Sequence, residues 1–179
     1  MRSDSRGLRG RWWLAWLLAL QMWAAAPAWA QQPIPERLGV RLGIVNYLGE
    51  ALDPVSIDQV WAGNARPRSY SSGTCCVSIA TRWTPGMTMR VAWNSDSMFR
   101  RGDKRLVARE VPVLPFEPFH DGFIWAVFLP GGEVYLQPAA ARPGAEGFLQ
   151  GLPQPGDETP ADLRRFIENN PLPSAPPSR

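Results

Sequence analysis

The chain holds few side chains of the types that carry nucleophilic or metal chemistry: two neighbouring cysteines, Cys75 and Cys76, and one histidine, His120. His120 precedes Asp121, and a histidine oriented by a carboxylate is the arrangement of a general base. No Gly-x-Ser-x-Gly turn accompanies it. One histidine and two adjacent cysteines also lack the spaced ligand pairs of a tetrahedral metal site. The sequence therefore predicts a protein that is not an enzyme, with no catalytic residue, metal site or cofactor.

The cysteine pair itself has three interpretations. Adjacent side chains in a strand point to opposite faces, so one thiol would face the core and the other the opposite side. The pair could be two reduced, largely buried thiols, or a vicinal disulfide, which closes a tight ring between neighbours. It could also be redox-active, although such pairs usually have two residues between the cysteines. We expect the reduced, largely buried pair.

Residues 1–30 have the organisation of a cleaved export signal. Four arginines precede an apolar run from Trp12 to Ala26, Pro27 interrupts the run, and Ala28-Trp29-Ala30 matches the small-x-small pattern before a cleavage site. The run is short for a transmembrane span. We expect a periplasmic protein with no transmembrane segment after cleavage, an uncleaved N-terminal anchor being the alternative. No cysteine lies near the cut, so the chain is not an evident lipoprotein.

The charge of the chain changes when this segment is removed. Four of its 19 basic residues and one of its 16 acidic residues precede residue 31, which leaves 15 of each. A nucleic-acid-binding surface needs an excess of basic residues. The sequence therefore predicts no nucleic-acid partner.

Alternation of apolar and polar residues with a period of two predicts an all-β fold. About seven short strands are expected, with turn residues between them. Residues 123–129 are nearly all apolar, as in a central strand covered on both faces, and Pro130-Gly131-Gly132 predicts a hairpin after them. The expected strands span residues 40–47, 55–61, 75–80, 87–94, 105–111, 123–129 and 134–136.

These strands predict a single-domain β-sandwich, mostly antiparallel, over residues 31–138, with a small barrel as the alternative. Residues 139–170 are expected to form a Pro/Gly-rich strap and one short helix, followed by a disordered tail at 171–179. Thr159, Pro160 and Asp162 provide an N-cap, a proline at the first helical position and an acid three residues after the cap. Asn170-Pro171 ends the helix.

Two loops carry the side chains expected to contact a partner. Aromatic and arginine side chains on loops often anchor protein interfaces. The first loop lies in the polar stretch after the expected strand at 87–94. The alternative to a contact role is an ordinary loop in which Phe99 turns into the core. The groups are Met98, Phe99, Arg100 and Arg101, and, with less weight, Arg66, Arg68 and Tyr70.

The tryptophans Trp61, Trp83, Trp93 and Trp125 could form a platform for stacking sugars. Tryptophans in apolar stripes of strands are more often part of the core. We therefore interpret these four as core residues.

The residues around the cysteine pair resemble a known signature. Cys75-Cys76-Val77, Trp83-Thr84-Pro85-Gly86 and Val91-Ala92-Trp93 are similar to the pattern CCVxLPxxWxPGxxxxVxW, with Ala80 in place of its proline. The pattern marks a domain-of-unknown-function family of small envelope proteins in Gram-negative bacteria. The resemblance extends over about residues 38–138 and assigns signature roles to Cys75, Cys76, Trp83, Pro85, Gly86 and Trp93.

The resemblance implies a function through binding. Family members are often encoded at type VI secretion loci beside lipase-type antibacterial effectors, where some resemble immunity proteins. We therefore expect a periplasmic protein that neutralises a lipase-like secreted effector by direct contact, close to the membrane surface. The alternatives are an accessory envelope protein that assists effector loading or apparatus assembly, and a carbohydrate- or lipid-binding module.

Overall fold

The structure, a computed structural model, describes residues 35–146 and 148–171. The predicted export signal lies outside these residues, as does the predicted tail apart from Pro171. In chain order the elements are β1 (Arg37–Asn46), β2 (Leu52–Ile57), β3 (Val60–Ala65), β4 (Ser69–Ala80), β5 (Thr88–Ser95), α2 (Asp96–Arg100), β6 (Val107–Pro112), β7 (Phe123–Phe128), β8 (Val134–Ala139), the 3₁₀ helix η1 (Phe148–Gly151) and α3 (Pro160–Asn169).

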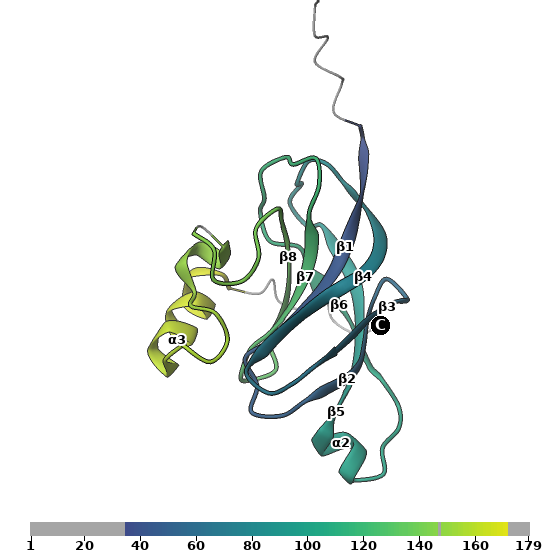
Figure 1. Cartoon of the computed structure of the whole chain (residues 1–179), viewed down its shortest axis with the longest axis vertical. Helices are drawn as coiled ribbons and strands as arrows, with labels where there is room; N and C mark the ends of the chain where they lie inside the picture. Colours follow the sequence, from purple (N-terminus) through teal and green to yellow (C-terminus); the bar gives the residue numbers. More distant parts are fainter. Residues whose placement is uncertain (1–34, 147, 172–179) are drawn as a thin grey trace, which may run out of the picture. The chain divides into compact units, whose positions relative to one another are not determined.

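The strands form two four-stranded sheets (Figure 1). Sheet A has the order β4-β1-β7-β8, and sheet B has the order β3-β2-β5-β6. Strands β1 and β7 pair in parallel, and the other neighbouring strands within the two sheets are antiparallel. The predicted all-β sandwich is therefore confirmed, and the alternative of a small barrel is wrong, because the two sheets remain separate.

Strand β7 is buried on both faces, as its apolar sequence predicts. All six of its residues are buried. Ile124, Ala126 and Phe128 belong to the core between the two sheets. The alternate residues Phe123, Trp125 and Val127 belong to a second core on the outer face of sheet A. A strand that is apolar on both faces needs a covering layer on each, so sheet A requires a third layer besides sheet B.

The C-terminal segment provides that layer, and Figure 1 shows α3 beside β7 and β8. Phe148, Leu149, Leu152 and Phe166 complete the second core. Three buried aromatic side chains of sheet A also donate hydrogen bonds to backbone carbonyls of this segment. They are Trp125 Nε1 to Ala141 O at 3.2 Å, Tyr47 Oη to Pro153 O at 2.7 Å and Tyr135 Oη to Asn170 O at 2.8 Å.

Helix α3 begins with the capping box that the sequence predicts. Asp162 N donates to Thr159 Oγ1 at 3.3 Å, and Thr159 N donates to Asp162 Oδ2 at 2.9 Å, with Pro160 in the first turn. These two bonds satisfy backbone donors that have no partner within the helix. At the other end, Asn170 Nδ2 donates to Phe166 O at 2.9 Å. Phe166 is thereby fixed against sheet A.

The expected strand at 55–61 is wrong in one respect, because the structure divides this region into β2 and β3. Asp58 and Gln59 form the turn between them, with φ angles of 49° and 67°. Two consecutive positive φ angles are typical of a type I′ hairpin turn, which usually contains Asn-Gly or Asp-Gly. Asp-Gln is a rare sequence for this turn, and the alternation of Val55, Ile57 and Trp61 continues across it, so the pattern hides the break.

Gly43 on β1 allows the largest side chain of the second core to fit. It pairs with Trp125 on β7 and with Ser72 on β4. A Cβ atom at position 43 would overlap the Trp125 ring. Without that atom, Trp125 extends over β1 and its ring meets Tyr70 of β4 edge-on, with centroids 6.2 Å apart.

We predict that Gly43→Ala destabilises the protein by about 1–3 kcal/mol, the range for overpacking a well-packed core. Gly39 on the same strand is the matched control, because a Cβ there would meet nothing within 4 Å. Gly39→Ala should be neutral or stabilise by up to about 1 kcal/mol. Urea unfolding of both variants measures the difference, and equal stabilities would contradict this role for Gly43.

Candidate functional site

The side chain of Asn46 joins two loops at one end of the sandwich. Asn46 is fully buried at the end of β1. Its Nδ2 donates to Glu50 O and to Arg66 O, each at 2.9 Å, and its Oδ1 accepts from Leu48 N at 2.9 Å. The loop between β1 and β2 is thereby fixed to the loop between β3 and β4. An apolar side chain of similar size could make none of these three hydrogen bonds.

Helix α2 is attached to the same loop through Glu50. Its N-cap residue, Ser95, makes no side-chain capping bond. The carboxylate of Glu50 serves instead, accepting from Ser97 N at 2.8 Å, and Asp96 N donates to Ala51 O at 3.1 Å. The expected loop after β5 is therefore wrong over residues 96–100, which form one turn of helix because these contacts satisfy its first backbone donors.

These bonds also determine the ionisation of Glu50. Partial burial favours the neutral acid and acts to raise the pKa of Glu50. The backbone N–H of Ser97, the hydroxyls of Ser97 and Ser95 and the charge of Arg100 outweigh this effect, so that the pKa of Glu50 lies below its ordinary value of 4.5. The carboxylate is therefore held in its charged form at the start of α2.

The segment after α2 is fixed by Asn94 in a similar way. Asn94 is 4% exposed, and its Nδ2 donates to Asp103 O at 2.9 Å and to Arg105 O at 3.0 Å. Asp103 N also donates to Met98 O at 3.0 Å. Helix α2 is thus anchored on one side by Glu50 of the β1–β2 loop and on the other by Asn94 near the end of β5.

This anchored end carries most of the residues that the sequence predicts to contact a partner. We define the contact end as residues 66–68 together with α2 and Arg101. Figure 1 shows α2 at the end of β5. Phe99 is 67% exposed, so the alternative in which it turns into the core is wrong. Arg66 and Arg101 are exposed and have no ion-pair partner among the residues that the structure describes. Met98 is half-buried.

Two of the predicted contact residues have structural partners instead. Arg68 forms an ion pair at 2.8 Å with Glu158, whose side chain is only 2% exposed, and so links the contact end to the C-terminal segment. The same carboxylate lies near Tyr47, whose pKa is raised by burial and, to a smaller extent, by the charge of Glu158. Tyr70 is 43% exposed, but its ring packs against Trp125 on sheet A.

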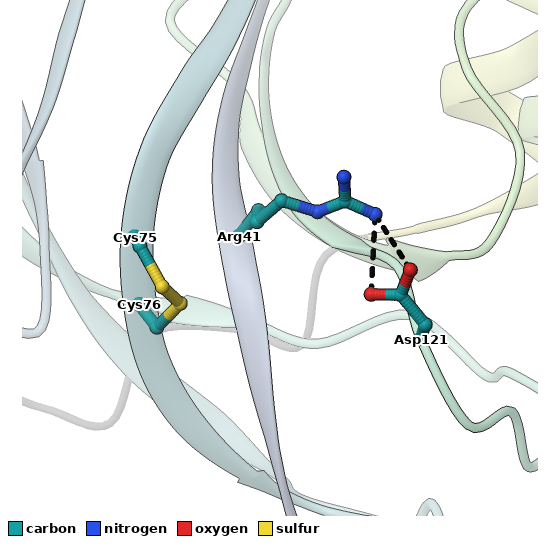
Figure 2. The surroundings of a disulfide bond; sticks show 4 residues. All are labelled: Arg41, Cys75, Cys76 and Asp121. Atoms are coloured by element: carbon teal, nitrogen blue, oxygen red, sulfur yellow. Dashed lines mark hydrogen bonds and ion pairs between the residues drawn. A yellow bond between two sulfur atoms is a disulfide. The ribbon is translucent and has the colours of Figure 1, made fainter.

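The cysteine pair differs from the expected state. Cys75 and Cys76 form a disulfide, and both residues are exposed (Figure 2). The prediction of reduced, largely buried thiols on opposite faces is therefore wrong. Val40 pairs with Val77 and Leu42 with Thr74, so that the two cysteines lie opposite a single residue, Arg41. This β-bulge interrupts the alternation of faces on which the prediction depended.

The remaining signature residues lie in the core or in the turn before β5. Trp83 is half-buried and donates from Nε1 to Val113 O at 2.8 Å. Trp93 is 8% exposed and packs edge-on against Phe128. Pro85 is exposed, and Gly86 has a φ of 82°, which suits glycine in the turn before β5. The Trp83 bond therefore connects the turn to the segment after β6, and the Trp93 contact joins the two sheets.

The interpretation of the tryptophans as core residues is confirmed for Trp93 and Trp125, which are 8% and 0% exposed. It is wrong for Trp61, which is 57% exposed on the outer face of sheet B. Trp83 is half-buried. The four tryptophans therefore do not form a shared platform.

His120 is exposed beside β7, and its neighbour Asp121 does not orient it. Both oxygens of Asp121 accept from one terminal nitrogen of Arg41, at 3.1 and 3.0 Å, as Figure 2 shows. The Arg41 guanidinium also lies over the Phe123 ring, 4.3 Å from its centroid. The described residues contain no group of three or more His, Cys, Asp and Glu side chains arranged to hold a metal ion.

The family described as "protein of unknown function (DUF3304)" matches residues 45–136, just over half of the 179 residues. The chain belongs to this family. No curated protein and no solved structure matches the chain. The matched residues include the whole contact end and both strand-end asparagines. Among the helices of the described residues, none has the length and apolar character to cross a membrane.

The sequence did not indicate Asn46, Glu50 or Asn94 as residues that build this site. Each is a single polar residue at or just after the end of an apolar strand, without a distinguishing motif. Their partners lie up to 47 residues away along the chain. Only the polar break after each strand could have drawn attention to them.

We predict that Glu50→Gln destabilises the protein by about 1 kcal/mol at pH 7, because the neutral amide is a weaker acceptor for the first turn of α2. A lowered folded-state pKa contributes stability above the unfolded value, near 4.5, and this contribution is lost as the pH falls through the folded-state value. The gap between wild type and variant should therefore narrow progressively as the pH falls below 4.5. Urea unfolding over a series of pH values from 7 downwards measures it, with the exposed Glu36→Gln as control. A gap that does not change with pH below 4.5 would contradict this role for the charge.

Proposed function

We propose that this protein is an exported binding protein that neutralises a lipase-type effector of a type VI secretion system by direct contact. It acts in the periplasm, after its N-terminal signal is removed. No group of the protein takes part in a reaction. Its activity is to hold a surface of fixed shape against the effector and so block the effector's active site or its approach to the membrane.

The observation that carries this proposal is that Phe99 is exposed on a helix turn whose position is fixed. A single exposed apolar side chain is ordinary on a protein surface, so the exposure of Phe99 supports a contact role only together with its fixed position and its arginine neighbours. Phe99 lies on a helix turn that Glu50 and Asn94 fix from both sides, with Arg100 and Arg101 beside it. Aromatic and arginine side chains contribute most of the energy at protein interfaces. Because the backbone around Phe99 is already fixed, binding loses less conformational entropy there.

The resemblance of the residues around Cys75 and Cys76 to the signature of small Gram-negative envelope proteins supports the kind of partner. Members of that family are often encoded beside such effectors. The export signal supports the compartment. The family to which the chain belongs is one of unknown function, so the effector itself is part of the proposal. The sugar-binding alternative loses support because Trp93 and Trp125 are buried.

We predict that the double variant Phe99→Ala, Arg101→Ala weakens effector binding at least about tenfold, the usual cost of truncating central interface residues. We expect a lipase-like effector to be encoded beside this gene, and that protein serves as the partner in the test. Affinity is measured by calorimetry, and protection by co-expressing both proteins in the periplasm. The variant should retain wild-type stability, because both side chains are exposed.

The matched control is Trp61→Ala, Arg90→Ala, which removes another exposed aromatic–arginine pair, near the opposite end of sheet B. It should bind and protect like the wild type.

Arg68→Ala is unsuitable as a test, because it leaves the buried Glu158 carboxylate without its cation. If the wild-type chain fails to protect, while deletion of its gene stops effector delivery, the accessory function replaces this proposal.

A further inference from the structure

The cysteine pair is the part of the signature to which the proposed function gives no role. Cys75 and Cys76 form a disulfide, and both residues are exposed. They lie on β4, the end strand of sheet A, whose one neighbour in that sheet is β1. In Figure 2 the Arg41 side chain extends from β1 toward Asp121 and leaves the two sulfur atoms uncovered. A thiol from solution can therefore reach the bridge.

The bridge contributes little to the stability of the fold. A disulfide stabilises a protein mainly by closing a loop of the unfolded chain, and its contribution grows with the number of residues in that loop. Cys75 and Cys76 are neighbours in the sequence, so their bridge closes no such loop. A thermodynamic cycle connects stability and reduction. Because this bridge does not stabilise the folded state, it should be no harder to reduce in the folded protein than in the unfolded chain.

Strand β4 keeps its position on both sides of the bridge through other contacts. On one side, Val77 pairs with Val40 on β1, and both Val77 and Ile79 are buried in the core between the sheets. On the other side, Thr74 pairs with Leu42, which is fully buried. None of these contacts involves a sulfur atom. The sheet should therefore remain intact when the S–S bond is broken.

We propose that Cys75–Cys76 is a surface redox site, which a protein dithiol reduces while the fold is retained. A thiolate of the reductant attacks one sulfur, the S–S bond breaks, and a mixed disulfide forms as the other cysteine leaves as a thiolate. The second thiolate of the reductant attacks the mixed disulfide, which releases the second cysteine and closes a disulfide in the reductant. Two electrons pass to the cysteines, and the two protons of the dithiol end on their thiolates.

The reductant comes from outside the chain, because the chain has two cysteines and both are in the bridge. A dithiol of the Cys-x-x-Cys type suits the exchange, since its second thiol is held close enough to complete it. The site is additional to the proposed function, in which no group of the protein reacts with the effector. The bridge also lies outside the contact end, so effector binding does not require it.

The first test compares reduction of the bridge in the folded and the unfolded protein. The purified full-length chain is equilibrated with mixtures of reduced and oxidised dithiothreitol, with and without enough urea to unfold it. Free thiols are alkylated after acid quenching and counted by mass spectrometry. We expect half-reduction at the same ratio of dithiol to disulfide within about threefold, because the bridge closes no loop. A bridge closing a loop of about 15 residues would need a ratio more than about a hundredfold higher in the folded protein, so protection of about tenfold or more would overturn the proposal.

The double variant Cys75→Ser, Cys76→Ser tests whether the fold needs the bridge. It should unfold at the same urea concentration as the wild type. Val77→Ala is the matched control, because Val77 is the next residue on β4, is 5% exposed and belongs to the core. The control should unfold at a lower urea concentration, as expected for a cavity in the core. A loss of stability in the serine variant as large as that in the control would overturn the proposal.

The class of reductant is tested with a thioredoxin whose second active-site cysteine is replaced by serine. This probe stops at the mixed disulfide, because it lacks the thiol that completes the exchange. We expect a covalent adduct with the folded wild-type chain, detected by non-reducing electrophoresis and mass spectrometry, and no adduct with Cys75→Ser, Cys76→Ser. If the wild-type chain formed no adduct, reduction would be limited to small thiols, and the proposal of a protein dithiol would be overturned.

Discussion

The two apolar faces of sheet A must both be covered, and this constraint determines how the layers of the protein are arranged. Its central strand β7 contributes three side chains to each of two cores. Burial of large apolar side chains contributes about 1.5–3 kcal/mol each, so neither face is stable in water alone. Sheet B covers one face and the C-terminal segment covers the other. The outer face of sheet B and the ends of the sandwich are not covered by these two layers.

Two buried asparagines then determine how one of these ends is built. Asn46 and Asn94 each lie at the end of a strand, and each donates its two amide hydrogens to carbonyls of neighbouring loops. The two sites differ at the carbonyl oxygen of the side chain. Asn46 Oδ1 accepts a backbone N–H, whereas Asn94 Oδ1 is buried and receives no hydrogen bond from the described residues.

The sequence predicts the parts of this structure that depend on local patterns. The run from 123 to 129 predicts a doubly covered strand, Pro130-Gly131-Gly132 predicts the β7–β8 hairpin, and Thr159 with Asp162 predicts the start of α3. Each of these depends on neighbours within a few residues, so the physical cause is contained in the pattern itself.

The sequence does not predict the features that depend on distant partners. The first turn of α2 depends on Glu50, 47 residues before Ser97. The exposure of Cys75 and Cys76 depends on the register between β4 and β1, since a bulge of one residue changes which face a side chain takes. Phe99 and Arg101 could be proposed as contact residues from their types alone, but the helix turn that carries Phe99 depends on contacts with distant residues.

The central proposal of this account is that the protein acts through the contact end, where Phe99 and Arg101 are exposed on a turn anchored by Glu50 and Asn94. Hydrogen–deuterium exchange of the protein with and without its bound effector tests the claim most directly. The account predicts that binding slows exchange in residues 94–105 and 64–68 and leaves residues 140–170 unchanged. Protection confined to residues 140–170 would show that the C-terminal layer is the binding surface, and would contradict the account.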